Sequence, residues 1–204
     1  MKKLILLAAV ACFAAVTTAQ AQKVYKDAQN RVVLDMTIEA GMPAGAQTST
    51  PKTWTGTPSN VAHLANNGAQ ATINATVYHK LEVAPHDINT ATQIVPSGGT
   101  RTMNWAVAFS ACRNSTHGGG GWRLPTQREM QMLFIFRPAL EDTFADPSIN
   151  GTNFEIANYW TATEEDGTDR AWYTTFERIR NNVPSSNYSK GNPGYYVRCV
   201  REMP

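Results

Sequence analysis

The sequence predicts an α+β domain in which two helices pack on a twisted antiparallel sheet, preceded by a β-rich or partly irregular N-terminal extension. Helical patterns between residues 104 and 138 come before strand-like patterns that start at residue 159, and this order is typical of α+β domains. Aromatic residues also concentrate in the second part: three lie between residues 22 and 99, and fifteen lie between residues 100 and 204. A large aromatic core can therefore form only in that second part.

The stretch from Gly118 to Thr126, Gly-Gly-Gly-Gly-Trp-Arg-Leu-Pro-Thr, predicts a loop, a buried anchor and a capped helix. Four glycines favour a loop because glycine loses the most backbone entropy on ordering. Trp122 supplies a large apolar ring, for which we expect burial against the sheet. Thr126 and Glu129 form the Thr-x-x-Glu pattern of a capping box. Apolar residues then recur at helical spacing: Met130, Leu133 and Phe134.

The N-terminal part, residues 22–76, is expected to be an extension of the main domain. Two short β-like runs flank the polar turn from Asp27 to Asn30, which predicts a hairpin. Residues 41–60 are rich in Gly, Pro, Thr and Ser and predict a loop or linker. Strand character over 76–83 indicates the first strand of the main domain. We place this domain at residues 77–204.

The main domain begins its helical part at Asn104, a favourable N-cap residue. Trp105, Phe109 and Cys112 follow at spacings that place them on one helical face, so Cys112 is expected on the buried side. Pro138 should end the second helix, and a short helix is expected over 139–144. From residue 159 onward, alternating patterns predict the strands of the sheet.

These stretches, in this order, resemble the Lcl C-terminal domain family, which is named after the C-terminal domain of a collagen-like bacterial adhesin. The resemblance covers roughly residues 80–204. It rests on Trp-Arg-Leu-Pro-Thr, on Asn104-Trp105, on the strands at 159–163 and 171–173, and on the closing strand at 196–201. It implies a C-type-lectin-like fold, akin to that of formylglycine-generating enzymes, and a role in adhesion, although one fold hosts many functions.

The first 21 residues match a secretory signal peptide. Lys2 and Lys3 precede an apolar run over 4–16, and Ala19-Gln20-Ala21 is a small-x-small cleavage site, so we expect cleavage after Ala21. A lipoprotein cleavage before Cys12 is less favoured because the apolar run continues past that cysteine. No later stretch is apolar enough to span a membrane. These features predict an exported protein that is periplasmic, surface-attached or extracellular.

Removal of the signal leaves 16 basic and 16 acidic residues and a net charge of zero. A neutral exported chain has no broad basic field for nucleic acid. The two remaining cysteines, Cys112 and Cys199, form one even pair in an oxidising compartment, which favours a disulfide. A zinc site is not supported, since no further Cys or His lies at ligand spacing. No cofactor is expected.

Two polar clusters suggest surface sites. Glu164, Glu165 and Asp169 crowd a turn that contains Asp166-Gly167, and they could hold calcium, although a solvated hairpin tip is the favoured interpretation. The second cluster surrounds the turn-like segment 181–187, where aromatic rings could stack on sugars and cations could hold sulfate or carboxylate groups. Its candidate ligand-binding residues are Arg178, Arg180, Tyr188, Lys190 and Tyr195.

The leading hypothesis for function is a non-enzymatic, adhesin-like protein that recognises a glycan, in particular an anionic one, or a protein on a host or bacterial surface. A second hypothesis is a structural or assembly subunit that pairs with another protein through exposed strand edges. A third is an oxidase of the formylglycine-generating type. It is disfavoured because its chemistry uses a cysteine pair at a substrate groove, whereas this pair is better placed to join the first helix to the last strand. The sequence leaves the oligomeric state open.

Overall fold

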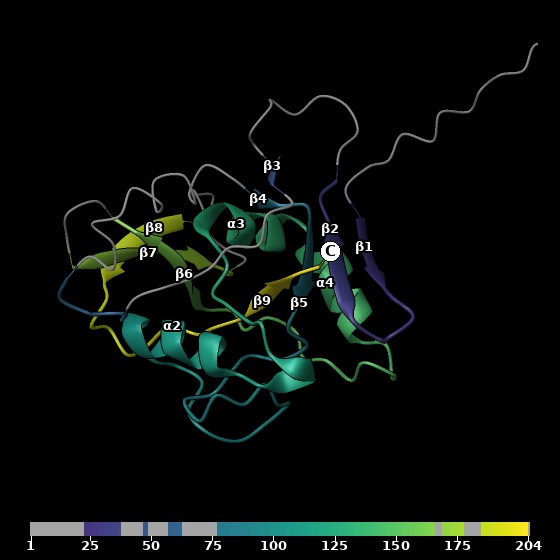
Figure 1. The fold of residues 1–204 in the computed structure, drawn as a ribbon, viewed down its shortest axis with the longest axis horizontal. Helices are drawn as coiled ribbons and strands as arrows, with labels where there is room; N and C mark the ends of the chain where they lie inside the picture. Colours follow the sequence, from purple (N-terminus) through teal and green to yellow (C-terminus); the bar gives the residue numbers. More distant parts are fainter. Residues whose placement is uncertain are drawn as a thin grey trace, which may run out of the picture.

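The computed structural model describes residues 23–37, 47–48, 57–62, 77–165, 169–177 and 185–203, and Figure 1 shows their arrangement. The predicted α+β class is confirmed: the described residues form two antiparallel sheets, a short parallel pair and three α-helices. The strands are β1 (Lys23–Lys26), β2 (Val32–Asp35), β3 (Gln47–Thr48), β4 (Val77–Tyr78), β5 (Lys80–Val83), β6 (Asn158–Glu164), β7 (Arg170–Thr175), β8 (Ser185–Ser189) and β9 (Val200–Glu202). The helices are α2 (Trp105–Asn114), the 3₁₀-helix η1 (His117–Gly119), α3 (Gln127–Ile135) and α4 (Arg137–Phe144).

The N-terminal hairpin shares a sheet with the main domain. β1 and β2 pair as the polar turn predicts, with Lys26 opposite Val32. β2 then pairs antiparallel with β5, and β5 pairs with β9, which gives the strand order β1-β2-β5-β9. The hairpin expected within the 22–76 extension is therefore continuous with strands at both ends of the 77–204 segment, and the sequence pattern did not reveal this pairing.

The helices begin where their capping residues predict. The Asn104 side chain accepts a hydrogen bond from the backbone N–H of Val107, which caps α2. At α3, Thr126 and Glu129 form the reciprocal hydrogen bonds of the predicted capping box. Pro138 lies in the first turn of α4, where its missing N–H costs no helical hydrogen bond, so this proline opens a third helix directly after α3.

The Glu129 carboxylate also binds a buried arginine. Arg123 donates to Glu129 Oε2 at 2.7 Å and to Glu202 Oε1 at 2.6 Å, so one guanidinium joins α3 to β9. Burial alone would raise the pKa of Glu129, but the Arg123 guanidinium holds this pKa below its usual range. The Arg-Leu-Pro-Thr stretch therefore fixes the start of α3 against the four-stranded sheet by a paired charge.

Two apolar clusters fill the interior. One surrounds Trp105, Trp160 and the Cys112–Cys199 disulfide, under α2. The other surrounds Leu34, Phe144 and further residues of α3, α4 and both sheets. Cys112 and Cys199 have no exposed surface, and their Cα atoms lie 5.7 Å apart. The expected disulfide and the expected burial of Cys112 on the inner face of the first helix are both present.

The closing strand is shorter than expected over 196–201. Only Val200–Glu202 forms β9, whereas Tyr195 and Tyr196 make single bridges to Met103 and Tyr159. The closing segment thus crosses between the two antiparallel sheets before it joins the four-stranded one. A sequence pattern shows strand character but cannot show this change of partner.

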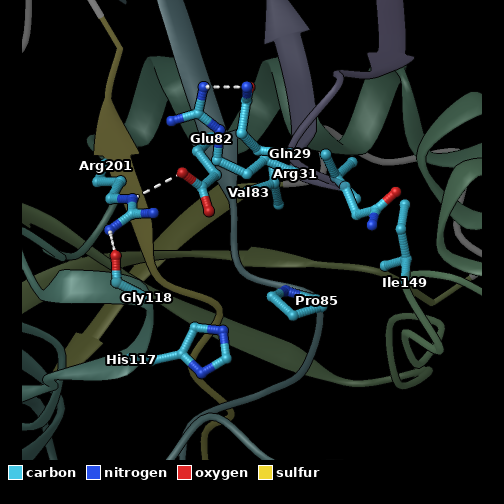
Figure 2. A pocket seen from close by; sticks show the side chains of 11 residues that line it. Gln29, Arg31, Glu82, Val83, Pro85, His117, Gly118, Ile149 and Arg201 are labelled. Carbon is cyan, nitrogen blue, oxygen red and sulfur yellow. Dashed lines mark hydrogen bonds and ion pairs between the residues drawn. The ribbon is translucent and has the colours of Figure 1, made fainter.

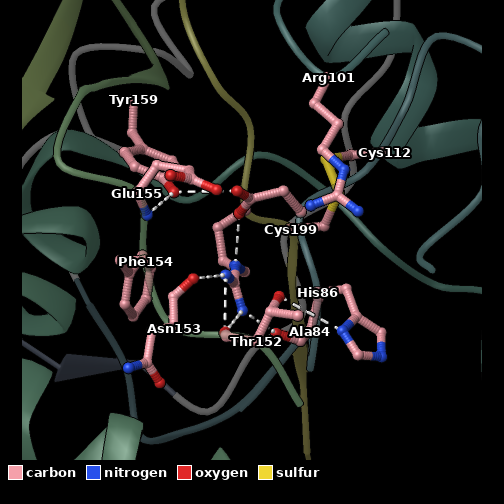
Figure 3. Close-up of polar contacts among 12 residues, drawn as sticks. Ala84, His86, Arg101, Cys112, Thr152, Asn153, Phe154, Glu155, Tyr159 and Cys199 are labelled. Atoms are coloured by element: carbon pink, nitrogen blue, oxygen red, sulfur yellow. Dashed lines mark hydrogen bonds and ion pairs between the residues drawn. A yellow bond between two sulfur atoms is a disulfide. The ribbon is translucent and has the colours of Figure 1, made fainter. Parts of the chain in front are cut away.

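A buried arginine fixes this crossing segment in place, in the surroundings that Figure 3 shows. Arg198 Nε donates to Asp87 Oδ1 at 2.7 Å, and the guanidinium nitrogens donate to the carbonyl oxygens of Ala84, Thr152 and Asn153. Tyr159 donates its hydroxyl to the other carboxylate oxygen of Asp87 at 2.9 Å. Because its donors are satisfied by the protein, Arg198 connects loops and is not available to a ligand.

His86 lies beside this network with its Nδ1 atom 3.3 Å from Thr152 Oγ1. Burial, with the nearby positive charges of Arg198 and Arg101, lowers the pKa of His86 to about 4 from 6.5. The folded protein therefore takes up this proton less readily than the unfolded chain does. The contribution of neutral His86 to the free energy of unfolding is therefore complete above pH 6.5 and is lost as the pH falls towards 4.

We therefore expect His86→Gln to flatten the dependence of stability on pH between 6.5 and 4. Denaturant unfolding of the wild type and of the variant at pH 7.5, 5.5 and 4.5 measures this dependence. The wild type should lose more unfolding free energy than the variant does over this range. Parallel losses in the two proteins would show that His86 does not contribute to the acid sensitivity.

Candidate functional site

Three tyrosines form a cluster at the β7–β8 end of the molecule, and we call Tyr173, Tyr188 and Tyr195 the tyrosine cluster. The register of β7 and β8 pairs Tyr173 with Ser186, so Tyr173 and Tyr188 project from the same sheet face. The ring centroids of Tyr173 and Tyr195 lie 4.8 Å apart, and those of Tyr188 and Tyr195 lie 6.0 Å apart. Two of the predicted ligand-binding residues, Tyr188 and Tyr195, are thus neighbours.

The cluster is anchored at one side and open at the other. Tyr195 is buried and lies 4.5 Å from Trp160, ring centroid to ring centroid, in the core beneath α2. Tyr188 is 50% exposed and is one of the few large hydrophobic side chains that are exposed in the described part of the chain. Burial, followed by the proximity of Tyr173, raises the pKa of Tyr195 to about 12. The cluster therefore offers an exposed ring supported by a rigid core, with the Tyr195 hydroxyl protonated at neutral pH.

Lys190 does not join an exposed basic patch, so that expectation is corrected. Its side chain is fully buried, forms an ion pair with the Glu164 carboxylate and donates to the carbonyl oxygen of Ala62 at 2.9 Å. Its Nζ atom also lies 4.9 Å from the ring centroid of Trp105. The chain turns directly after β8, and the Lys190 carbonyl accepts the first N–H of α2, which directs this side chain inward.

The same ion pair corrects the expectation of a solvated acidic turn at Glu164. Glu164 is buried at the end of β6, where it neutralises Lys190 and does not face solvent. Arg178, Arg180 and the turn residues Asp166 and Gly167 lie outside the described residues. Within the described ranges, no group of three or more His, Cys, Asp or Glu side chains is arranged to hold a metal ion.

A polar pocket of about 390 Å³ lies elsewhere in the fold, and no sequence pattern indicated it. Figure 2 shows its open interior between the turn of the N-terminal hairpin, the end of β5, the glycine loop and β9. The pocket is lined by Gln29, Asn30, Arg31, Val32, Glu82, Val83, Pro85, His117, Gly118, Ile149 and Arg201. The turn and the glycine loop are each recognisable as loops from sequence, but only the strand pairing brings them together.

Arg201 fixes the wall of this polar pocket. Its Nε atom donates to Glu82 Oε2 at 2.7 Å, and its Nη1 atom donates to the carbonyl oxygens of Gly118 and Gly120 at 2.7 and 2.8 Å. The guanidinium carbon lies 4.6 Å from the ring centroid of Trp122. Trp122 is buried as predicted, and its indole N–H donates to the His117 carbonyl oxygen at 2.7 Å. Arg201 and Trp122 thus both hold the glycine loop in place.

His117 is one of the residues that line the polar pocket. Burial lowers its pKa, with the Glu82 carboxylate opposing and the Arg201 guanidinium supporting this shift. The imidazole is therefore neutral at pH 7 and carries one donor and one acceptor nitrogen. Among the described residues, neither ring nitrogen has a hydrogen-bond partner. His117 can thus both donate a hydrogen bond to a polar ligand in the pocket and accept one from it, while Arg201 holds the surrounding wall in place.

In a comparison with protein-family models, the Lcl C-terminal domain model matches residues 82–201, which is more than half of the chain. The match begins in β5 and ends in β9, so it includes the tyrosine cluster and leaves out the N-terminal hairpin. Comparison with curated proteins finds no match. None of the helices in the described ranges is long and apolar enough to cross a membrane.

Proposed function

The chain belongs to the Lcl C-terminal domain family, and from this premise we propose that it is an exported, non-enzymatic binding protein that recognises glycans. The family points to a surface, adhesin-like protein. Export is supported by the signal-like first 21 residues, and a C-type-lectin-like arrangement of the family domain is part of the same proposal. The ligand would be a glycan on a host or bacterial surface.

The tyrosine cluster carries this proposal. An aromatic ring buries much apolar area at low entropic cost and keeps a polar edge for hydrogen bonds, which suits the mixed faces of a sugar. Tyr188 is half exposed, and Tyr195 behind it is fixed against Trp160. A pre-organised aromatic surface binds with little loss of side-chain freedom. The exposed Tyr188 ring is therefore the proposed contact for a sugar ring.

The preference for an anionic glycan rests on Arg178 and Arg180, which precede β8 in the sequence. Arginine side chains bind sulfate and carboxylate groups by paired, charge-assisted hydrogen bonds. Lys190 is removed from this proposal because its charge is neutralised inside the protein. Exposed charges are screened over about 8 Å at physiological ionic strength, so the affinity should be modest and should fall with added salt.

Tyr188→Ala is expected to lower the affinity for a bound glycan by about tenfold, because central aromatic residues of binding surfaces contribute more than 1 kcal/mol. The measurement is titration of matched sulfated and unsulfated glycans against the wild type, Tyr188→Ala and an Arg178→Ser/Arg180→Ser double variant. The arginine variant should lose the preference for the sulfated form. Tyr25→Ala is the matched control, since this partly exposed tyrosine lies on β1 at the other end of the molecule.

Unchanged binding in folded Tyr188→Ala and in the folded double variant would show that this surface is not the site. Equal affinity of the wild type for sulfated and unsulfated forms would contradict the anionic preference. An equal loss of glycan affinity in the Tyr25→Ala control would show that the loss in Tyr188→Ala is not specific to the tyrosine cluster.

A structural or assembly subunit is the second candidate. Strand β1 forms one edge of the four-stranded sheet in the described part of the chain, and an edge strand can pair with a strand of another protein. Measurement of molecular mass in solution separates the two candidates, because a monomeric binder and a self-pairing subunit differ in size. The oxidase alternative finds less support, since Cys112 and Cys199 are joined to each other inside the core.

A further inference from the structure

We propose that the polar pocket is a second binding site, separate from the tyrosine cluster, and that it takes one neutral saccharide unit. The two places lie at opposite ends of the fold, because β8 and the β1–β2 hairpin are far apart in Figure 1. A volume of about 390 Å³ is at the lower end of the range for small-molecule sites, which is roughly 300 to 1,000 Å³.

The charges around the pocket balance, and this favours a neutral ligand. Arg31 Nε donates to Asp27 Oδ2 at 2.7 Å, and Arg201 Nε donates to Glu82 Oε2 at 2.7 Å. Each guanidinium therefore already has its own carboxylate partner. An anion would meet the Glu82 carboxylate and a cation would meet two arginines, whereas a neutral molecule meets no like charge.

The remaining hydrogen-bonding atoms match hydroxyl groups, which both donate and accept. Glu82 Oε1 accepts no hydrogen bond from the described residues and is the acceptor for a ligand hydroxyl. The side-chain amide nitrogens of Gln29 and Asn30 donate to no described residue, and His117 offers one donor and one acceptor. Donors from the hairpin turn and an acceptor from β5 thus line the same pocket.

Apolar side chains complete the walls. Val83, Pro85 and Ile149 line the same pocket and would pack against the C–H face of a sugar ring. A hexose presents hydroxyl groups at its rim and C–H groups on its faces. The polar lining atoms suit the hydroxyl groups, and the apolar side chains suit the C–H groups. A purely apolar ligand would leave the polar lining atoms without partners, and this carries a desolvation cost.

The hairpin turn is held in place before any ligand binds. Lys26 Nζ donates to Asp146 Oδ2 at 2.7 Å and to Ser148 Oγ at 2.9 Å. The Ser148 hydroxyl lies 2.6 Å from Asp146 Oδ1 and 3.1 Å from Asn30 Oδ1. These contacts tie the hairpin turn to the loop that also contributes Ile149, so this wall of the pocket is formed before a ligand binds.

The test uses the purified exported protein and small probes, whereas the proposed function is tested with polymeric glycans, so the two can fail separately. Saturation-transfer NMR would compare methyl glycosides of glucose, galactose, mannose and N-acetylglucosamine with those of glucuronic acid and glucosamine. At least one neutral glycoside should bind more tightly than the acidic and the basic ones. The pocket variants are Gln29→Ala and Asn30→Gly, and the matched control is Asn114→Ala, an exposed amide at the end of α2.

Asn30→Gly removes the amide without disturbing the turn, because Asn30 has φ 59°, a conformation that glycine adopts readily. Each pocket variant should weaken binding by about two- to tenfold, the range for losing one hydrogen bond, and the control should bind as the wild type does. The proposal is overturned if no neutral glycoside binds, if the charged glycosides bind equally well, or if both folded pocket variants retain full affinity.

Discussion

Replacement of Cys112 by serine is expected to lower the free energy of unfolding by about 4 to 5 kcal/mol, the chain-entropy estimate for a loop of this length. The disulfide joins α2 to the closing segment across a sequence separation of 87 residues. Without it, the unfolded chain gains the freedom that this loop closure removes. For a domain of this size the melting temperature should fall by roughly 10 °C or more, which calorimetry measures.

The reduced wild type and Cys199→Ser serve as matched controls, since each removes the same link by a different change. All three proteins should melt within a few degrees of one another, and Cys199 should react with a thiol label in unfolded Cys112→Ser. A melting temperature of Cys112→Ser equal to that of the oxidised wild type would show that the link does not stabilise this fold.

Replacement of Trp122 by alanine is expected to cost about 3 to 5 kcal/mol, the usual range when a large aromatic side chain is removed from a core. Trp122 is 2% exposed. Its ring packs against the Arg201 guanidinium, and its indole N–H donates a hydrogen bond to the carbonyl oxygen of His117. Its loss would leave a cavity and free the glycine loop from β9. Denaturant unfolding at pH 7.5 measures the cost.

Trp122→Phe separates packing from hydrogen bonding in this prediction. Phenylalanine keeps most of the apolar volume and loses the bond to His117, so its cost should be clearly smaller than that of alanine. Iodide quenching provides an independent check, because a buried Trp122 should be protected from iodide. Quenching of Trp122 at the rate of a free indole would contradict the burial on which the prediction depends.

Local rules accounted for much of this fold. Asn104 and Thr126 predicted the starts of two helices because capping depends on residues three positions apart. The turn from Asp27 to Asn30 predicted the N-terminal hairpin for the same reason, since its hydrogen bonds are local. The burial of Trp122 followed from its size and from the flanking loop.

Features that depend on distant partners could not be predicted. Lys190 and Glu164 neutralise each other from positions 26 residues apart, and each alone resembles an exposed surface charge. The polar pocket needs a turn from the N-terminal hairpin beside a loop that follows α2, and only the β2–β5 and β5–β9 pairings place them together. The tyrosine cluster could be predicted in part, since Tyr188 and Tyr195 are close in sequence, but the contact of Tyr195 with Trp160 could not.

Glycan recognition is the central claim, and a glycan-array screen of the purified exported protein tests it most directly. The account predicts binding to a restricted set of glycans, stronger for sulfated or carboxylated members than for their neutral counterparts and weaker at higher salt. The absence of binding to any glycan by folded, disulfide-linked protein would contradict the account and would favour the assembly subunit.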